Sequence, residues 1–341
     1  MHRVLGKAHW LEVGLILVAA PACGAASDLV AAAYGDYDPN QPPKVMALAG
    51  PLAFHDPTLF RSGERYWVYG SGQGLEAKSS ANLQTWQNEA RVFDQNPNWI
   101  ADLLPDVTAL WSPSVAYFGS MYHLYYSASV FGANQSCIGH ATAAFVDAGS
   151  VFEDHGSIIC SNVSGQTDDF NAIDPSVFVE SEQTPWLAFG SYNSGIKLIP
   201  LDATGARLGS ELVSLARRGS DNPAIQEPFV YEWRGWYYLF VSFDQCCQGV
   251  NSTHNIRVGR SHNLGGPYID KAGVNMMNGG GTLVLGGDDH WPGPGSNVIF
   301  NDGARHFNVY HAYDADNNGV NTLRIAEITF DNDGWPVSAG P

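Results

Sequence analysis

Short runs of aromatic and branched residues recur along the chain, and each follows a second apolar run and a turn. The aromatic runs lie at 66–69, 122–126, 186–189, 236–241 and 306–310. Such runs bounded by turn-forming residues predict β-strands, and a strand–turn–strand order predicts a hairpin. We therefore expect an all-β protein.

The hairpins belong to a repeated unit. The five units span residues 55–72, 111–129, 173–192, 226–243 and 295–313. Four share a proline, two apolar positions, a turn and an aromatic strand, whereas the fifth retains only the second half. Their prolines, at positions 57, 113, 175 and 228, are 56, 62 and 53 residues apart. A strand-rich repeat of this length predicts blades of a propeller rather than a sandwich, so we expect a five-bladed β-propeller.

The N-terminal segment has a different pattern. Arg3 and Lys7 make a basic start, residues 13–20 are apolar, and small residues follow at 22–26 around Cys23. This order is typical of a secretory signal peptide, and lipidation of Cys23 is the alternative. The apolar run is shorter than the ~18 residues that a membrane-spanning helix needs. We predict a signal peptide over 1–26, one propeller domain over 27–341 and a secreted, extracellular protein with no membrane span.

The charge of the chain limits its partners. It has 17 Lys and Arg against 34 Asp and Glu, a net charge of −17. Nucleic acids and anionic membranes bind clustered positive charge, so both are poor partners for this chain. A neutral sugar polymer meets no such objection.

Four cysteines follow the predicted signal peptide, at 137, 160, 246 and 247. An even count in an exported chain indicates disulfides. Cys137 and Cys160 would close a modest loop, while Cys246 and Cys247 would form either a bond to each other or two separate bonds. A zinc site is the competing interpretation, but the usual paired spacings of cysteine and histidine are missing.

The residue before each repeat proline is a candidate for chemistry. These residues are Asp56, Ser112, Asp174 and Glu227. Innermost strands of a propeller line its central channel, so side chains at one repeat position converge near the channel mouth. An aspartate before proline is also a common turn residue. Three carboxylates at one repeat position favour a site over three unrelated turns.

Converging carboxylates can hydrolyse a glycosidic bond. One carboxyl protonates the leaving oxygen and another activates a water on the opposite face of the sugar. A third carboxylate raises the pKa of the acid by like-charge repulsion and keeps it protonated. Trp111 could stack on a sugar ring, and packing between blades is its alternative role.

Longer motifs resemble the arabinanases of glycoside hydrolase family 43 between Phe54 and Trp335. The matching segments are HDP (55–57), LWSP (110–113), YHLYYSAS (122–129), FGANQS (131–136), NAIDP (171–175), FGSY (189–192), FVSFDQCCQGVNSTHNIRVGRS (240–261), GGPYIDKAG (265–273), GGGTLVL (279–285), WPGPGSN (291–297) and YHAYD (310–314). The resemblance implies a five-bladed propeller that cleaves α-1,5-linked L-arabinan with inversion. The partner implied is plant cell-wall arabinan or an arabino-oligosaccharide.

The resemblance also implies residue roles. Asp56 corresponds to the general base, and Asp174 to the carboxylate that modulates the pKa of the acid and orients it. The implied substrate wall contains, besides Trp111, the residues Asn171, Ala172, Ile173, Ser191, Tyr192 and Asn193.

Two positions depart from the family pattern. The family's acid stands two residues before the fourth proline, where this chain has Gln226, and its glutamate is Glu227. Neighbouring strand residues face opposite sides, so this shift matters, but Glu227 aligns with Asp56 and Asp174 in the chain's own repeat. We predict Glu227 as the acid.

The second departure concerns metal. The family's fifth blade often has a histidine that holds a hydrated calcium ion in the channel, and this chain has Ser296 there. The sequence therefore identifies no certain cofactor. His311 is a weak metal candidate, because a histidine on an aromatic strand is more often packed.

The leading hypothesis is thus a secreted arabinan hydrolase. One alternative is an α-L-arabinofuranosidase or β-xylosidase of the same fold. The other, prompted by Gln226, is a non-catalytic arabinan-binding propeller.

Overall fold

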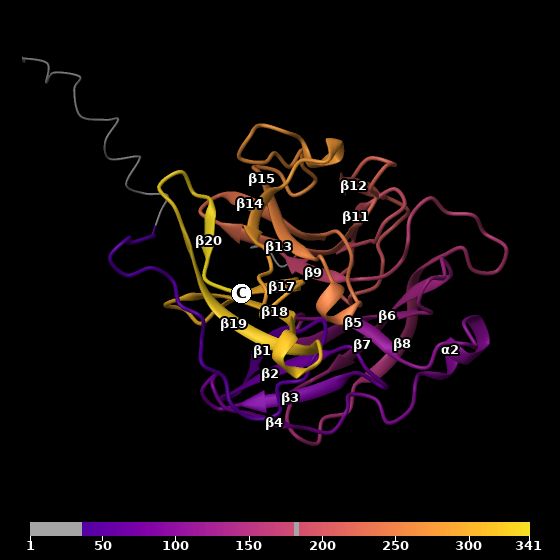
Figure 1. The fold of residues 1–341 in the computed structure, drawn as a ribbon. Coiled ribbons are helices and arrows are strands. Elements are labelled where there is room, and N and C mark those ends of the chain that lie inside the picture. Colours follow the sequence, from indigo (N-terminus) through magenta and orange to yellow (C-terminus); the bar gives the residue numbers. More distant parts are fainter. Residues whose placement is uncertain (1–35, 181–183) are drawn as a thin grey trace, which may run out of the picture.

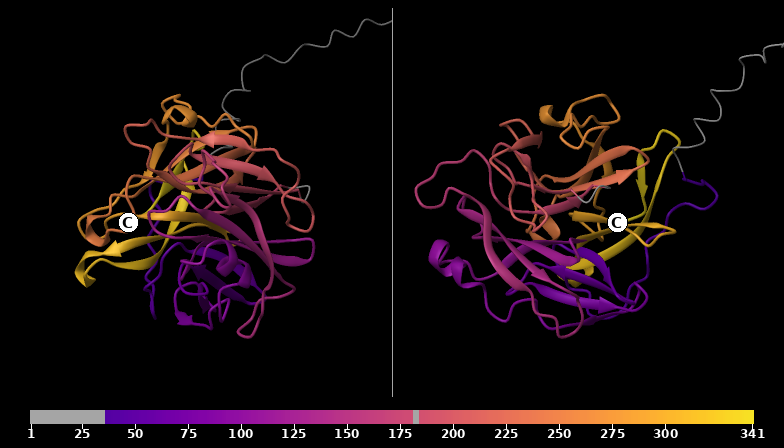
Figure 2. Two further views of the ribbon diagram at one scale, coloured as in Figure 1. Left: turned by 90° about the vertical axis from the view of Figure 1, so that its right-hand side faces the viewer. Right: turned by 180° about the vertical axis from the view of Figure 1, so that it is seen from behind.

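The structure is a computed structural model that describes residues 36–180 and 184–341. The predicted signal peptide over 1–26, with Cys23, lies outside these residues. The described chain forms five four-stranded antiparallel sheets, and each sheet uses four consecutive strands. Figures 1 and 2 show the sheets following one another around a common centre in the order of the sequence. The expected five-bladed β-propeller is confirmed.

The blades have the following strands. Blade 1 contains β1 (Thr58–Ser62), β2 (Arg65–Gly70), β3 (Glu76–Ser80) and β4 (Trp86–Asn88). Blade 2 contains β5 (Leu110–Phe118), β6 (Met121–Ser129), β7 (Ser136–Ala143) and β8 (Glu153–Ser161). Blade 3 contains β9 (Ser176–Val179), β10 (Pro185–Phe189), β11 (Ile196–Pro200) and β12 (Val213–Ala216). Blade 4 contains β13 (Ile225–Trp233), β14 (Trp236–Phe243), β15 (Asn255–Ser261) and β16 (Thr282–Leu285), and blade 5 contains β17 (Gly295–Asn301), β18 (His306–Asp314), β19 (Val320–Phe330) and β20 (Pro336–Ser338).

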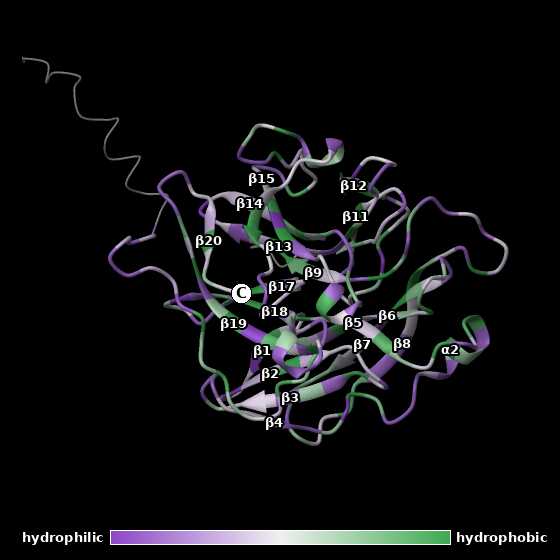
Figure 3. Ribbon diagram, in the orientation of Figure 1, coloured by the Kyte–Doolittle hydropathy of each residue, from purple (hydrophilic) through white to green (hydrophobic). Residues whose placement is uncertain are grey.

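The aromatic runs seen in the sequence are the second strands of the blades, and they form the apolar cores. Each second strand carries an aliphatic side chain with no exposed surface: Val68, Leu124, Leu187, Leu239 and Val309. Burying such a side chain stabilises the fold by roughly 1.5–3 kcal/mol. Figure 3 shows that the strands carry both hydrophobic and polar residues, as in β13, the first strand of blade 4.

One backbone feature recurs in all five blades. Asp56, Ser112, Asp174, Glu227 and Ser296 have φ values of 51°, 42°, 56°, 56° and 52°. Left-handed backbone is uncommon for residues other than glycine, so its recurrence marks one structural position. We call these five the ring residues. The fifth unit was predicted to lack this half of the repeat, and the structure corrects that: Ser296 occupies the position without a proline after it.

Side chains in or directly after the second strands hold the ring residues together across blades. In four of the five blade junctions, the backbone N–H of a ring residue donates to a side chain from the preceding blade. The pairs are Ser112 with Ser71 (2.9 Å), Asp174 with Ser127 (2.9 Å), Ser296 with Ser242 (3.0 Å) and Asp56 with His311 (3.3 Å). The last pair joins blade 5 to blade 1 and closes the propeller.

The N-terminal segment strengthens the same closure. It runs along β19, where Met46 N–H donates to Ile325 O at 2.9 Å and Leu323 N–H donates to Leu52 O at 2.8 Å. The helices of the described chain are short. They are α2 (Asn98–Leu103) and the 3-10 turns η1 (Gly249–Asn251), η2 (Met276–Asn278) and η3 (Ala315–Asn317). None of the described helices is long and apolar enough to cross a membrane.

Both predicted cysteine pairs are disulfides. Cys137 and Cys160 lie opposite each other on β7 and β8 and are bonded. Cys246 and Cys247 are bonded to each other in the loop after β14. The structure thus decides between the two arrangements left open for Cys246 and Cys247.

Candidate active site

Four of the five ring residues, Asp56, Ser112, Asp174 and Glu227, line a cavity of about 780 Å³ at one end of the channel. The three carboxylates Asp56, Asp174 and Glu227 all line it, although more than 50 residues separate each from the next in the sequence. The sequence predicted that these three side chains converge, and the structure brings them to one cavity. A second, much smaller space of about 30 Å³ is lined by all five ring residues and the residues that follow them.

The predicted substrate wall is largely present. Six of the seven predicted residues line the cavity: Trp111, Asn171, Ile173, Ser191, Tyr192 and Asn193. Trp111 is half-buried and faces the cavity, which favours sugar stacking over blade packing. Ala172 is corrected: it has no exposed surface and packs in the apolar core of blades 2 and 3. Its neighbours Asn171 and Ile173 line the cavity in the segment that leads into β9, whereas the Ala172 side chain is turned into the core.

The surroundings of Asp56 favour its ionised form. Its Oδ2 lies 2.9 Å from Nδ1 of His55 and accepts a hydrogen bond from the Ser71 hydroxyl. Burial alone would raise its pKa. The charge and hydrogen bond of His55, aided by His311 and Ser71, instead hold the pKa of Asp56 well below its usual range. A buried carboxylate kept ionised can accept a proton.

Asp174 lies between the other two carboxylates in the chain order and touches both neighbouring blades. Burial and the charge of Asp56 raise the pKa of Asp174 to about 7. The Ser112 hydroxyl donates to its Oδ1 at 2.8 Å, which opposes the increase. Asp174 is therefore poised to change charge near neutral pH.

The surroundings of Glu227 favour its protonated form. Burial, followed by the charges of Asp56 and Asp174, raises the pKa of Glu227 well above its usual range. Hydrogen bonds from Ser242 and from the backbone of Ser296 offset only part of this. Three carboxyls with divided pKa values can supply both an acid and a base.

Gln226 precedes Glu227 and also borders the cavity. Its side-chain nitrogen hydrogen-bonds to Nε2 of His254, and its Oε1 accepts from the Ser191 hydroxyl at 3.4 Å. His254 reaches this place because Gly295 has no side chain: a Cβ there would lie 2.4 Å from its Nδ1. Gln226 is thus fixed in a polar network beside the acid.

Several cavity residues were not predicted as site residues. His55 bonds to Asp56, and its Nε2 lies 3.0 Å from the hydroxyl of Tyr313, which also lines the cavity. Phe131 stands at the rim with 75% of its surface exposed. The loop from Gln245 to Gly249 forms one wall. The position of His55 next to Asp56 in the sequence could have identified it as a site residue. Tyr313 and the loop are far from Asp56 in the sequence, so their place in the cavity could not be predicted in this way.

The described residues contain one group that could hold a metal ion: His55, Asp56 and His311. It offers two nitrogens and one carboxylate, whereas calcium prefers six to eight oxygen ligands. Nδ1 of His311 already accepts a hydrogen bond from the Asp56 N–H, and the His311 ring stacks on His55 at 4.0 Å between centroids. This donor set does not fit calcium. Nε2 of His311 is buried and has no hydrogen-bond partner among the described residues.

Comparisons with known proteins agree with this geometry. The family model for Glycosyl hydrolases family 43 matches residues 50–336. An extracellular endo-α-(1→5)-L-arabinanase 1 of Bacillus subtilis is 39% identical over 287 residues, 83% of this chain and 86% of that protein. An extracellular exo-α-(1→5)-L-arabinofuranosidase of Cellvibrio japonicus is 31% identical over 98% of this chain and 94% of that protein.

The solved structures lead to the same family. An endo-arabinanase from Bacillus licheniformis superposes with a TM-score of 0.80 at 41% identity, covering 86% of this chain and 99% of that one. A Cellvibrio cellulosa α-L-arabinanase, solved with arabinohexaose, has a TM-score of 0.81 at 32% identity over 85% and 96% of the two chains. The chain therefore belongs to glycoside hydrolase family 43 and is a glycoside hydrolase.

Proposed function

We propose that the protein is a secreted hydrolase of α-1,5-linked L-arabinan that acts with inversion. The observation that carries this proposal is the division of pKa values among three carboxyls on one ring, with Asp56 lowered and Asp174 and Glu227 raised. The substrate assignment rests on relatives whose names describe endo- and exo-acting enzymes on α-1,5-L-arabinan.

The chemistry follows from these protonation states. Glu227 gives its proton to the glycosidic oxygen while the bond from that oxygen to the anomeric carbon breaks. Asp56 takes a proton from a water molecule as the water oxygen attacks the anomeric carbon from the opposite face. The product is an arabinose unit of inverted anomeric configuration, with Asp56 protonated and Glu227 ionised; exchange with solvent restores both.

Asp174 acts on the acid rather than on the sugar. Its charge contributes to the raised pKa of Glu227. We propose that it keeps Glu227 protonated and in place. His55 and Ser71 do the reverse for Asp56, because both stabilise its ionised form.

The cavity wall suits a neutral oligosaccharide. Trp111 and the exposed ring of Phe131 offer apolar faces for the C–H groups of a sugar ring. Asn171, Ser191 and Asn193 add polar groups for its hydroxyls. We propose arabinan or arabino-oligosaccharides of the plant cell wall as the substrate, met outside the cell after export by the predicted signal peptide.

We propose that no calcium takes part. The donor set of His55, Asp56 and His311 is unsuited to it, because calcium prefers six to eight oxygen ligands. Each step above uses only side chains of this chain and a water molecule.

Sugar release from linear arabinan, aryl α-L-arabinofuranoside and aryl β-xyloside tests the proposal. Rapid release from linear arabinan, with the inverted anomer first seen by NMR, is the expected result. Preference for either aryl glycoside would assign the protein to side-chain hydrolysis. Binding of arabinan without turnover would favour the sugar-binding alternative, which Gln226 at the family's acid position motivates.

A further inference from the structure

We propose that the Cys246–Cys247 disulfide is part of the sugar-binding wall. In this role it presents a fixed, apolar sulfur surface to the arabinofuranosyl ring held between the acid and the base. The inference rests on the proposed function and assigns to that site a specificity-determining element.

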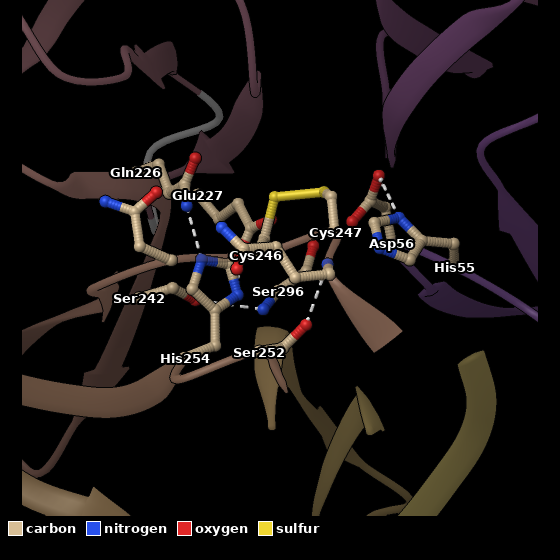
Figure 4. Close-up of a disulfide and its surroundings, with 12 residues drawn as sticks. His55, Asp56, Gln226, Glu227, Ser242, Cys246, Cys247, Ser252, His254 and Ser296 are labelled. Atoms are coloured by element: carbon tan, nitrogen blue, oxygen red, sulfur yellow. Dashed lines mark hydrogen bonds and ion pairs between the residues drawn. A yellow bond between two sulfur atoms is a disulfide. The ribbon is translucent and has the colours of Figure 1, made fainter. Parts of the chain in front are cut away.

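The disulfide lies in the catalytic cavity. Cys246 and Cys247 line it together with Asp56 and Glu227. In the view of Figure 4 the sulfur–sulfur bond lies between Glu227 on one side and Asp56 on the other. Cys246 is half-buried and Cys247 is exposed, so the bond borders the cavity instead of an apolar core.

A role in global stability does not account for this bond. A disulfide stabilises mainly by closing a loop in the unfolded chain, and adjacent residues enclose almost none. The Cys137–Cys160 bond is the opposite case. It spans 23 residues, and Cys137 has no exposed surface. The two disulfides of the described chain therefore have separable functions.

The loop that carries the bond is held in one position by its backbone. The N–H of Cys247 donates to the hydroxyl of Tyr313 at 2.9 Å, and the N–H of Gln248 donates to Oγ of Ser252 at 3.0 Å. The N–H of Gln245 donates to Oγ1 of Thr253 at 3.1 Å. Because Tyr313 also bonds to His55, which contacts Asp56, the loop is anchored to the same network as the base.

The chemistry of the bonded sulfurs suits a sugar face. A disulfide has no hydrogen-bond donor, and its sulfur atoms are polarisable and pack well against C–H groups. Reduction adds two hydrogen atoms to form two thiols, which turn independently and carry weak S–H donors. The oxidised pair therefore offers a flat, fixed contact that the reduced pair lacks.

The test measures binding and turnover in matched variants. In the Asp56→Asn background, arabinohexaose binding is compared by calorimetry with and without the Cys246→Ala/Cys247→Ala change. In the active background, the same double change is compared with Cys137→Ala/Cys160→Ala for KM and melting temperature. We expect Kd and KM to rise about tenfold on loss of the Cys246–Cys247 bond, with the melting temperature little changed. Loss of the Cys137–Cys160 bond should lower the melting temperature and leave KM unchanged.

If the double variant does not fold, mild reduction of the wild-type protein provides the second test. Alkylation and mass analysis then identify protein in which only the exposed Cys246–Cys247 bond is open, and its KM should rise equally. A Kd and KM within twofold of the oxidised protein would overturn this inference while leaving the proposed function intact. If Asp56→Asn fails to bind arabinohexaose and the wild type does not cleave arabinan, the proposed function itself fails.

Discussion

Glu227 and Asp174 share a left-handed backbone with φ of 56° on neighbouring blades, and the charge of Asp174 contributes to the raised pKa of Glu227. Gln226, one residue earlier, is not among the residues with positive φ. Glu227 thus occupies the ring position held in blades 1 and 3 by Asp56 and Asp174. This supports Glu227, instead of a residue at the position of Gln226, as the proton donor.

We expect Glu227→Gln to lower kcat on arabinan by about 10²–10⁴-fold, because the leaving alkoxide needs a proton. On an arabinofuranoside with an acidic phenol leaving group the same change should cost less than about tenfold, since that group departs without protonation. Initial rates on the two substrates check this. An equal loss on both would contradict the acid assignment.

The matched variant is Gln226→Glu. It adds a carboxylate next to Glu227 in the network of His254 and Ser191. We expect unchanged or lower activity on arabinan, because the new charge competes with the existing acid. A large gain from a nearly inactive natural protein would instead assign the acid to position 226 and make the natural protein a binder.

Asp56→Asn should reduce hydrolysis to below a few per cent of the wild-type rate and leave binding of arabino-oligosaccharides nearly unchanged. A carboxamide has almost the same shape as a carboxylate but does not take a proton from water. Turnover and calorimetric Kd are measured side by side. Glu64→Gln is the control, because its side chain is 95% exposed on a hairpin of blade 1. Activity retained in Asp56→Asn would remove Asp56 as the base.

The repeat in the sequence was sufficient to predict the fold because it combines strand signals with a regular proline. The prolines also located Asp56, Asp174 and Glu227, since one repeat position becomes one place in the ring. The fifth blade has Asn297 where the others have proline, so Ser296 could not be recognised as the fifth member. Its backbone φ of 52° reveals it.

Other parts of the site depend on contacts that no local pattern encodes. The bond from Tyr313 to His55 joins residues 258 positions apart, and it requires blade 5 to close against blade 1. The resemblance placed Ala172 in the wall with its neighbours, but its side chain packs in the apolar core of blades 2 and 3. His254 enters the channel only because Gly295 leaves space for it.

The alkaline limb of the pH profile should move when Asp174 is changed. The charge of Asp174 raises the pKa of Glu227, so Asp174→Asn should lower that pKa. Glu227 must be protonated to act, and activity is lost as pH rises through its pKa; the limb should therefore shift to lower pH. Profiles of kcat/KM on arabinan for wild type and variant test this, with Asp221→Asn, an exposed aspartate, as control. An unmoved limb would refute the coupling.

Chelation should leave hydrolysis unchanged. The donor set at His55, Asp56 and His311 does not suit calcium, and the mechanism proposed uses no metal. Arabinan hydrolysis is measured after dialysis against EDTA and again with calcium restored. A loss of activity that calcium reverses would show that the channel binds the ion through water molecules or groups other than these three.

Two buried histidines of blade 2 should make the fold sensitive to acid. His123 and His140 are each 2% exposed, and Nδ1 of His123 lies 3.0 Å from Nε2 of His140. Burial lowers the pKa of His123 to about 4 and, with the charge of His123, that of His140 to about 3. In the unfolded chain their pKa returns to about 6.5. Between these values the unfolded state binds more protons, so each histidine removes stability as pH falls from about 6.5 toward 4.

The size of this effect is isolated by comparing wild type with His140→Gln. Each histidine contributes at most about 1.4 kcal/mol per pH unit to the slope of the unfolding free energy. Asp174 and Glu227 contribute with the opposite sign, because their pKa values are raised in the folded protein. Urea unfolding at pH 4.5 to 7 should show a less positive slope of the unfolding free energy against pH in His140→Gln than in the wild type. His262→Gln, at an exposed histidine, controls for removal of an imidazole. Parallel slopes in wild type and His140→Gln would mean that the buried pair takes up its protons without opening the blade.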